Sequence, residues 1–275
     1  MPNALRIAVI GDHQLPFHDP RAIRVARAVM KDFAPHRIVN VGDYYDLPDL
    51  SIKFTRTPEF KNQLSMVRKL GREIIEKDLE ATGLDPVDYT LIEGNHEKRL
   101  RDFVIARADA LYELTADGGA LSLPVLMGIE DIGYVKPYPQ TMEIHFGGGG
   151  IFLARHGTAV GRYPATAELA KFHKSGISGH THRISVGFEP GWNTHAGWWS
   201  NGALCNVDGP NVPPDFAGAS TDRRGWQQGI TLLDFSMDRK LYDAHTVVIE
   251  NGKTRVQGKD YVDRGGRSNL GEVDG

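Results

Sequence analysis

The sequence predicts an α/β protein whose functional groups lie at the ends of buried strands. Two observations support this prediction. Strand-like apolar runs alternate with amphipathic helical stretches through the first two thirds of the 275 residues, and short polar clusters follow nearly all of the apolar runs. This alternation implies parallel strands joined by right-handed crossovers, and ligands collect outside the carboxyl ends of such strands.

The first part of the chain reads as three strands separated by two helices. Leu5–Ile10 is a short β-branched run typical of a buried strand, and Pro20–Phe33 carries apolar residues at helical spacing. Arg37–Val41 is the next strand, Glu59–Glu80 the next helix and Tyr89–Ile92 the third strand. The polar clusters at the three strand ends are Gly11-Asp12, Gly42-Asp43 and Gly94-Asn95-His96-Glu97.

Beyond residue 130 the apolar runs become shorter. Met142–Phe146 and Ile151–Ala154 flank four glycines, which predicts a hairpin around Gly147–Gly150. A phosphate-binding loop is the alternative for these glycines, but no Lys-Ser/Thr pair follows them. Tyr163–His173 reads as a helix, and Gly176–Ser178 leads into the cluster Gly179-His180-Thr181-His182.

The last third is less regular. Glu189–Gln228 is rich in Gly, Pro and Asn and is predicted to be a long loop, with four tryptophans at Trp192, Trp198, Trp199 and Trp226. These side chains either stack on a base or plug the second sheet or an interface, and the second role is favoured. Gly229–Phe235 and Tyr242–Ile249 are predicted to pair in a second sheet. Residues 1–263 then form one domain, and residues 264–275 a flexible tail.

Composition narrows the class of protein. A net charge of −3 and a pI near 6.4 give no overall positive field, so charge alone does not predict tight nonspecific binding to nucleic acid. The single cysteine, Cys205, excludes an intrachain disulfide framework and reads as a buried small residue. No signal peptide and no bilayer-spanning segment is recognised. We therefore expect a cytoplasmic protein without membrane association, and a homo-oligomer is left open.

The polar clusters together predict one dinuclear metal site. Carboxylate, amide and imidazole groups suit hard-to-borderline divalent metals. Asp43 carries two oxygens that can bridge two metals, and Asp12 beside it would bind the first. His180 and His182 are one residue apart, so on an extended segment their side chains lean to the same side and reach adjacent metals.

The remaining roles follow from residue type. Asn95 offers a neutral amide oxygen, whereas His96 stays free of metal and can protonate a leaving oxygen. Each cluster alone is weak, because Gly-Asp is common in turns and a lone histidine is usually a packed structural residue. Their order along the chain favours the metal site, and the sequence therefore predicts a metal-dependent hydrolase.

In this order the clusters resemble those of the calcineurin-like metallophosphoesterase superfamily, from Asp12 to His182. The resemblance implies an α/β fold in which a two-sheet β-sandwich is flanked by helices in four layers. It implies two divalent ions, manganese first and iron, zinc, nickel or cobalt as alternatives, with a hydroxide shared between them attacking phosphorus. The implied ligands are Asp12, Asp43 and His182 for the first metal, and Asp43, Asn95, His156 and His180 for the second.

The resemblance also implies further catalytic groups. His96 would be the general acid, oriented by a carboxylate such as Asp46 or Glu97. Arg99 or Arg183 would bind the phosphate oxygens of the substrate.

One position departs from the family pattern. The first family motif is Asp-x-His, whereas Gln14 stands at its third position here and His13 is displaced by one residue. A shift of one residue turns a side chain to the opposite face of a strand, so His13 would substitute only in an irregular loop. Gln14 can offer its amide oxygen, a weaker ligand than imidazole. The expected consequence is a looser first metal, a preference for manganese, or a site filled only when substrate arrives.

Three function classes remain open. The segments Gln14-Leu-Pro-Phe-His-Asp, Gly-Asn-His-Glu-Lys-Arg and Trp-Gln-Gln-Gly resemble compact phosphoesterases of bacteriophage and bacterial genomes. The favoured class is a phosphoesterase acting on phosphodiesters, with nucleotides, nucleic acid or small phosphate esters as substrate. A nuclease of the double-strand-break repair type is the second class, although those proteins usually add a DNA-binding domain. A non-catalytic metal-binding scaffold is the third.

Overall fold

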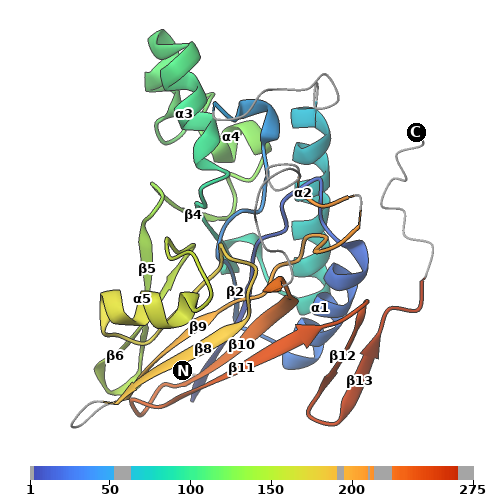
Figure 1. Cartoon of the computed structure of the whole chain (residues 1–275), viewed down its shortest axis with the longest axis vertical. Helices are drawn as coiled ribbons and strands as arrows, with labels where there is room; N and C mark the ends of the chain where they lie inside the picture. Colours follow the sequence, from blue (N-terminus) through green and yellow to red (C-terminus); the bar gives the residue numbers. More distant parts are fainter. Residues whose placement is uncertain (1–2, 53–62, 191–194, 210, 214–224, 266–275) are drawn as a thin grey trace.

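The computed structural model describes residues 3–52, 63–190, 195–209, 211–213 and 225–265. Two sheets face each other, and helices cover their outer faces (Figure 1). One sheet has six strands in the order β11-β10-β1-β2-β3-β4, and the other has five in the order β5-β6-β7-β9-β8. Strands β12 and β13 form a separate hairpin beside the first sheet.

The bounds of the elements are as follows. The α-helices are α1 (Pro20–Phe33), α2 (Gln63–Thr82), α3 (Lys98–Arg107), α4 (Leu123–Met127) and α5 (Pro164–Phe172). The short 3-10 helices are η1 (Pro48–Leu50), η3 (Pro86–Asp88), η4 (Asp109–Thr115) and η5 (Gly147–Gly149). The strands are β1 (Ala4–Ile10), β2 (Arg37–Asn40), β3 (Tyr89–Ile92), β4 (Gly133–Val135), β5 (Thr141–Phe146), β6 (Gly150–Arg155), β7 (Gly176–Ser178), β8 (Ser185–Pro190), β9 (His195–Ser200), β10 (Gln228–Ser236), β11 (Tyr242–Ile249), β12 (Lys253–Val256) and β13 (Lys259–Val262).

The first sheet has the predicted parallel core, since β1 pairs with β2 and β2 with β3 in parallel. Alternate side chains of β1 point to opposite faces, as strand geometry requires. Ile7 and Val9 belong to the core between the sheets, whereas Ala8 and Ile10 belong to the core under the helices. Because both faces are covered there, the buried part of the strand, residues 7–10, reads as a continuous apolar run.

Helix α1 begins and ends at residues suited to those places. The Asp19 carboxylate accepts hydrogen bonds from the backbone N–H groups of Arg21 and Ala22, and Pro20 occupies the first helical position. The helix ends at Phe33, and the following Ala34 is in the left-handed conformation and donates its N–H to the Met30 carbonyl. These caps explain why the predicted bounds of α1 agree with the observed ones.

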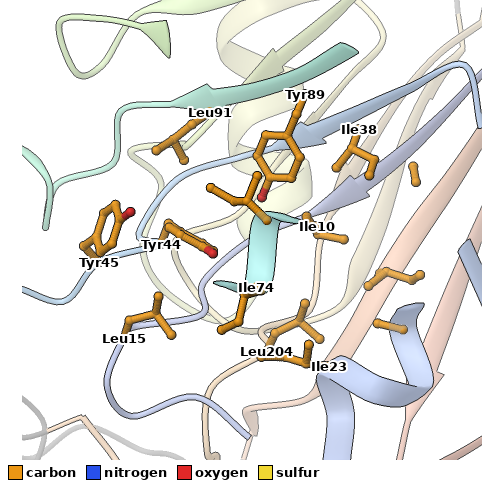
Figure 2. Close-up of a cluster of buried hydrophobic side chains, with 14 of the residues drawn as sticks. Ile10, Leu15, Ile23, Ile38, Tyr44, Tyr45, Ile74, Tyr89, Leu91 and Leu204 are labelled. Carbon is orange, nitrogen blue, oxygen red and sulfur yellow. The ribbon is translucent and has the colours of Figure 1, made fainter. Parts of the chain in front are cut away.

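The core under α1 and α2 includes the two tyrosines that follow Asp43. Figure 2 shows Tyr44 and Tyr45 in the same buried cluster as Ile74 of α2. The Tyr44 hydroxyl donates to the carbonyl of Gly71, 2.7 Å away. A Cβ atom at Gly71 would lie 2.5 Å from the Tyr45 hydroxyl oxygen, so the glycine lets helix and loop approach closely.

The four-layer arrangement expected from the resemblance is confirmed. Aromatic side chains fill the space between the sheets, with Phe152 5.4 Å from Phe235 and 6.0 Å from Trp199 between ring centroids. On the outer face of the second sheet, Leu169 of α5 packs in a cluster with Trp198. The layers therefore run from α1 and α2 through the two sheets to α5.

Two expectations about the last third were wrong. Strands β10 and β11 pair with each other as expected, but β10 also pairs antiparallel with β1 and so extends the first sheet. The residues from 189 to 228 contain β9, whose Trp198 and Trp199 are buried, so they are not one long loop. The many Gly, Pro and Asn residues of this stretch favoured a loop prediction although its aromatic residues favour a strand. The pairing partner of a strand cannot be predicted from the strand's own residue pattern.

Other expectations are confirmed or fall outside the described residues. Strands β5 and β6 form the hairpin around the four glycines, and Trp198 and Trp199 help to plug the second sheet. Trp192 and the tail from residue 266 lie outside the described residues, as do residues 59–62 of the predicted second helix. Among the described helices, none combines the length and apolar character needed to cross a bilayer.

Candidate metal centre

The sequence-predicted ligands converge where strand ends of both sheets meet. Asp12 follows β1, Asp43 follows β2 and Asn95 follows β3. From the other sheet, His156 follows β6, and His180 and His182 follow β7. Apart from His180 and Asn95, which are partly buried, all of these side chains are buried.

Several of these residues have a strained backbone. Asp12, Gln14, Asp43, His180 and His182 have φ angles of 51°, 53°, 48°, 77° and 55°. Non-glycine residues rarely adopt this left-handed region, which costs about 1 to 3 kcal/mol each and is concentrated at functional sites. The tight turns direct consecutive polar side chains into one small volume.

Glycines before the ligands make room for carboxylates. A Cβ atom at Gly94 would lie 2.2 Å from Asp43 Oδ1, and one at Gly179 would lie 2.5 Å from Asp12 Oδ2. Both distances are too short for real contacts. The glycine that begins the Gly-Asn-His and Gly-His-Thr-His patterns is therefore explained by the packing of the two aspartates.

One part of the centre gathers around Asp43. His156 Nε2 lies 3.2 Å from Asp43 Oδ2 and 3.0 Å from Asn95 Oδ1. His180 Nδ1 lies 3.2 Å from the same Nε2 atom. Ligand atoms of Asp43, His156 and His180 all lie within 4.8 Å of one another, which is compact enough to hold one ion.

The other part of the centre gathers around Asp12. His182 Nε2 lies 3.3 Å from Asp12 Oδ1. Gln14 Nε2 lies 3.2 Å from Asp43 Oδ2 and 3.5 Å from His182 Nε2. Gln14 Oε1 is buried without a hydrogen-bond partner among the described residues. His13 points away and packs edge-on against the ring of Tyr44, with centroids 4.7 Å apart.

The imidazole rings are oriented by different partners. His156 Nδ1 lies 2.8 Å from the Val41 carbonyl oxygen, so an Nδ1–H can donate there and leave Nε2 for a metal. His182 Nδ1 lies 3.8 Å from the Cys205 thiol, and the His182 ring contacts Trp226 at 4.3 Å between centroids. Cys205 is buried as predicted, but its contact with His182 had no signal in the sequence.

His96 lies beside the centre with its own polar partners. Its Nδ1 atom is hydrogen-bonded to the Asp46 carboxylate, and its Nε2 atom lies 3.7 Å from Asp43 Oδ2. Arg99 Nη2 lies 3.1 Å from His96 Nε2, and Arg99 Nη1 donates to the Asp46 carbonyl at 2.6 Å. His96, Asp46 and Arg99 therefore form one connected group.

Glu97 and Arg183 have different surroundings. The Glu97 carboxylate accepts backbone N–H groups of Asp43 at 3.0 Å, Tyr45 at 2.9 Å and Gly94 at 2.8 Å. It thus ties the loops after β2 and β3 together, whereas Asp46 contacts the ring of His96. Arg183 Nη1 donates to the Gly161 carbonyl at 2.6 Å, which joins its loop to the loop after His156.

Burial and mutual charge shift the pKa values of these groups. Burial opposes ionisation of Asp43, but His156 and His96 outweigh it and hold the Asp43 pKa well below its usual range. Burial also opposes protonation of His156, yet Asp43 raises its pKa to about 9. Burial and the neighbouring His156 lower the His180 pKa to about 4. Burial and the Asp43 charge raise the Glu97 pKa to about 7.

The residues fit a divalent metal centre. Oxygen donors and imidazoles converge on one small volume, and this mixture suits borderline divalent ions. The buried, unpartnered Gln14 Oε1 atom is the kind of acceptor that an ion can satisfy. Metal binding displaces protons from such ligands, so the His156 proton would be released.

Comparisons with known proteins give two relatives that match most of the chain. No protein-family model matches the chain. It is 26% identical over 264 residues to the Gene 54 protein of Mycobacterium phage D29, covering 92% of this chain and 97% of the relative. It is 24% identical over 257 residues to the Gene 54 protein of Mycobacterium phage L5, covering 81% of this chain and 98% of the relative.

Solved structures with a similar fold include three further proteins. Vacuolar Protein Sorting 29 from Cryptosporidium parvum has a TM-score of 0.49 and 12% identity, covering 94% of this chain and 99% of that chain. A dimetal phosphatase from Danio rerio has a TM-score of 0.43 and 11% identity, covering 93% of this chain and 97% of that chain. The phosphoesterase Yfce from E. coli has a TM-score of 0.39 and 10% identity, covering 85% of this chain and 93% of that chain. In its two-sheet fold and in the residues gathered at its strand ends, the chain resembles the calcineurin-like metallophosphoesterases.

Proposed function

We propose that this protein is a metal-dependent phosphoesterase that prefers phosphodiesters and uses two divalent ions. One observation carries the proposal. A compact ligand group of Asp43, His156 and His180 lies directly beside a histidine, His96, whose other ring nitrogen is bonded to a buried carboxylate. A metal-ligand set next to an oriented imidazole provides both charge stabilisation and a proton donor.

The proposed ligands divide between the two ions. Asp12, Gln14, Asp43 and His182 would hold one, and Asp43, Asn95, His156 and His180 the other. When bound, such ions act as Lewis acids that polarise phosphoryl oxygens and favour ionised water at neutral pH. Manganese is the first ion to test, because the donor set mixes carboxylate, amide and imidazole groups.

His96 is the proposed general acid. Its Nδ1–H can donate to Asp46, which fixes the ring so that Nε2 faces Asp43 3.7 Å away. A proton on Nε2 can then pass to the leaving oxygen of the ester, and the Asp46 carboxylate stabilises the imidazolium. The role parallels that of a carboxylate behind a catalytic histidine in other hydrolases.

Arg99 is the proposed phosphate-binding side chain. Its guanidinium lies between the Asp46 carbonyl and His96 Nε2 and is largely buried. A guanidinium matches the geometry of phosphate oxygens better than an ammonium does. Once His96 Nε2 carries the proton, it no longer accepts from Arg99, and Arg99 Nη2 would donate to a phosphate oxygen instead.

The proposal is tested by hydrolysis of bis-p-nitrophenyl phosphate beside p-nitrophenyl phosphate. Metal-stripped wild-type protein receives manganese, and Asp43→Ala protein is the control. Diester cleavage that exceeds monoester cleavage and is lost in the control is expected, and cyclic nucleotides and DNA would then be assayed as substrates. Monoester preference would make the protein a phosphatase. Absence of both activities in manganese-loaded protein would reject catalysis and favour a metal-binding scaffold.

A further inference from the structure

We propose that Gln14 makes the two halves of the metal centre unequal, so that one ion binds readily and the second binds only after the Gln14 amide has turned. We call the ligands Asp43, Asn95, His156 and His180 the histidine half, and Asp12, Gln14 and His182, together with Asp43, the glutamine half. The inference rests on the proposed use of metal ions. It concerns their binding order, which is measured without substrate.

The orientation of the Gln14 amide is the first observation. Its nitrogen faces Asp43 Oδ2 at 3.2 Å and His182 Nε2 at 3.5 Å, both of which are ligand atoms. An amide N–H beside a carboxylate oxygen is favourable, because it donates a hydrogen bond to a negative charge. A metal ion bound between the same atoms would meet a donor hydrogen where it needs a lone pair.

The opposite end of the amide is the second observation. Gln14 Oε1 is buried and has no hydrogen-bond partner among the described residues. A half-turn of the amide would bring this oxygen to the side of Asp43 and His182. Two oxygens at that separation repel one another unless a cation lies between them. An ion in the glutamine half must therefore turn the amide, and the turn costs the hydrogen bond to Asp43.

The histidine half needs no amide turn, because Asn95 already directs its Oδ1 atom toward His156 Nε2. Its Asp43, His156 and His180 ligand atoms already lie within 4.8 Å of one another, and Asn95 Oδ1 lies 3.0 Å from His156 Nε2. No comparable group that includes Asp12 and His182 is found among the described residues. The histidine half is thus closer to a geometry that can bind an ion.

The support behind each imidazole differs in the same direction. His156 Nδ1 faces a backbone carbonyl at 2.8 Å, whereas His182 Nδ1 faces the Cys205 thiol at 3.8 Å. A carbonyl accepts a hydrogen bond strongly and a thiol weakly. Such partners behind a ligand change metal affinity by roughly 10 to 100-fold. The glutamine half has two carboxylates, Asp12 and Asp43, and the histidine half only one, so charge alone would favour the glutamine half. The cost of turning the Gln14 amide must therefore outweigh this charge difference for the histidine half to bind its ion first.

Calorimetric titration of metal-stripped protein with manganese, without substrate, tests the inference. We expect one tight ion and one that is weaker by at least roughly tenfold in wild type. Gln14→His should tighten the weaker ion and leave the tighter one unchanged, and Asn95→Ala should weaken the tight one. Gln140→His, which adds an imidazole at an exposed glutamine, is the matched control and should titrate like wild type.

A second variant covers the case in which Gln14→His fails to fold. Gln14→Glu places an oxygen beside Asp43 in every orientation, so its melting temperature should fall without manganese and rise more steeply than that of wild type when manganese is added. Two ions of equal affinity in wild type, or a weaker ion that neither variant affects, would overturn the inference. Unequal binding without hydrolysis would reject the phosphoesterase and leave the inference intact.

Discussion

The two sheets contribute different chemistry to the same site. Loops after the first sheet supply the oxygen donors, namely Asp12, Gln14, Asp43 and Asn95. Loops after strands of the second sheet supply the imidazole groups of His156, His180 and His182, which are the proposed ligands. The proposed acid His96 and its partner Asp46 also belong to the first sheet. Neither sheet carries a complete centre, so the site exists only when the two sheets are docked.

The loops are also held together across the sheets. The Val41 carbonyl of the first sheet accepts from His156 of the second, and Asp12 accepts the His180 backbone N–H at 3.1 Å. Within the first sheet, Glu97 joins the loops after β2 and β3. Because the proposed ligands come from both sheets, metal affinity should depend on how the sheets pack together. Proton transfer by His96 should depend on the first sheet alone, because His96 and Asp46 both belong to it.

Loss of one imidazole from the second sheet should have the largest effect. His156→Ala removes a ring that contacts Asp43, Asn95 and His180, and we expect both manganese binding in that half and hydrolysis to disappear. Metal content after gel filtration and the diester assay measure this. His145→Ala removes an exposed histidine of the same sheet and should behave as wild type.

Loss of the proposed acid, which lies on the first sheet, should impair turnover without impairing metal binding. His96→Gln should leave the manganese content unchanged and slow turnover by roughly 10² to 10⁴-fold, most strongly for esters with poor leaving groups. Comparing p-nitrophenyl and alkyl leaving groups tests this. Metal loss in this variant would show that His96 is itself a ligand.

Weakening the core between the sheets should act on stability and metal binding together. Phe152→Ala removes a fully buried ring that packs against Trp199 and Phe235, and should lower the free energy of unfolding by about 3 to 5 kcal/mol. Denaturant titration measures the loss. If manganese affinity depends on how the two sheets pack, it should fall as well. An unchanged manganese affinity would contradict that dependence.

Glu97 tests support from within the first sheet. Glu97→Gln replaces an oxygen that accepts backbone N–H groups by an amide nitrogen, which should loosen Asp43 and weaken manganese binding by roughly 10 to 100-fold. Titration calorimetry measures the change. Glu143→Gln, at an exposed position of the second sheet, is the control and should have no effect.

The smallest expected effect concerns Asp19, which caps α1 and also accepts from Gln228 Nε2 at 3.1 Å. Burial opposes its ionisation, but hydrogen bonds from Arg21 and Gln228 lower its pKa. Because the pKa of Asp19 is lower in the folded state than in the unfolded state, its ionised carboxylate stabilises the fold at pH values above the unfolded-state pKa. This contribution is lost as the pH falls through the folded-state pKa. Asp19→Asn keeps a helix cap but removes the charge that accepts hydrogen bonds from Arg21 and Gln228, so it should cost about 1 kcal/mol near neutral pH, and the difference should shrink below about pH 4. A pH-independent difference would assign the effect to packing.

The parallel core and its strand-end clusters could be predicted because each is local. Apolar runs at Leu5–Ile10 and Tyr89–Ile92 and the caps of α1 encode their own structure. The Asp12 and Asp43 clusters could be recognised because a parallel sheet brings its carboxyl ends together. The roles of these residues as ligands and acid remain predictions.

Contacts between distant segments could not be predicted from one sequence. The pairing of β10 with β1 depends on which edge is free, and β9 was masked by the glycines and asparagines around it. The Cys205 contact with His182 and the choice of Asp46 beside His96 depend on loop paths that leave no periodic signal. Such features follow from the packing of the whole chain.

The pairing of β10 with β1 has a consequence for protein synthesis. β1 starts at residue 4, and its antiparallel partner is complete only at residue 236. Trp226, which packs on the His182 ring, and Gln227, whose N–H donates to the His182 carbonyl, also come late in the chain. While a ribosome still holds the last third, β1, which precedes Asp12, can pair with β2 but not with β10, and His182 lacks its contacts with Trp226 and Gln227. A fragment truncated before residue 226 therefore contains every proposed metal ligand but lacks these contacts to His182 and the β10 neighbour of β1.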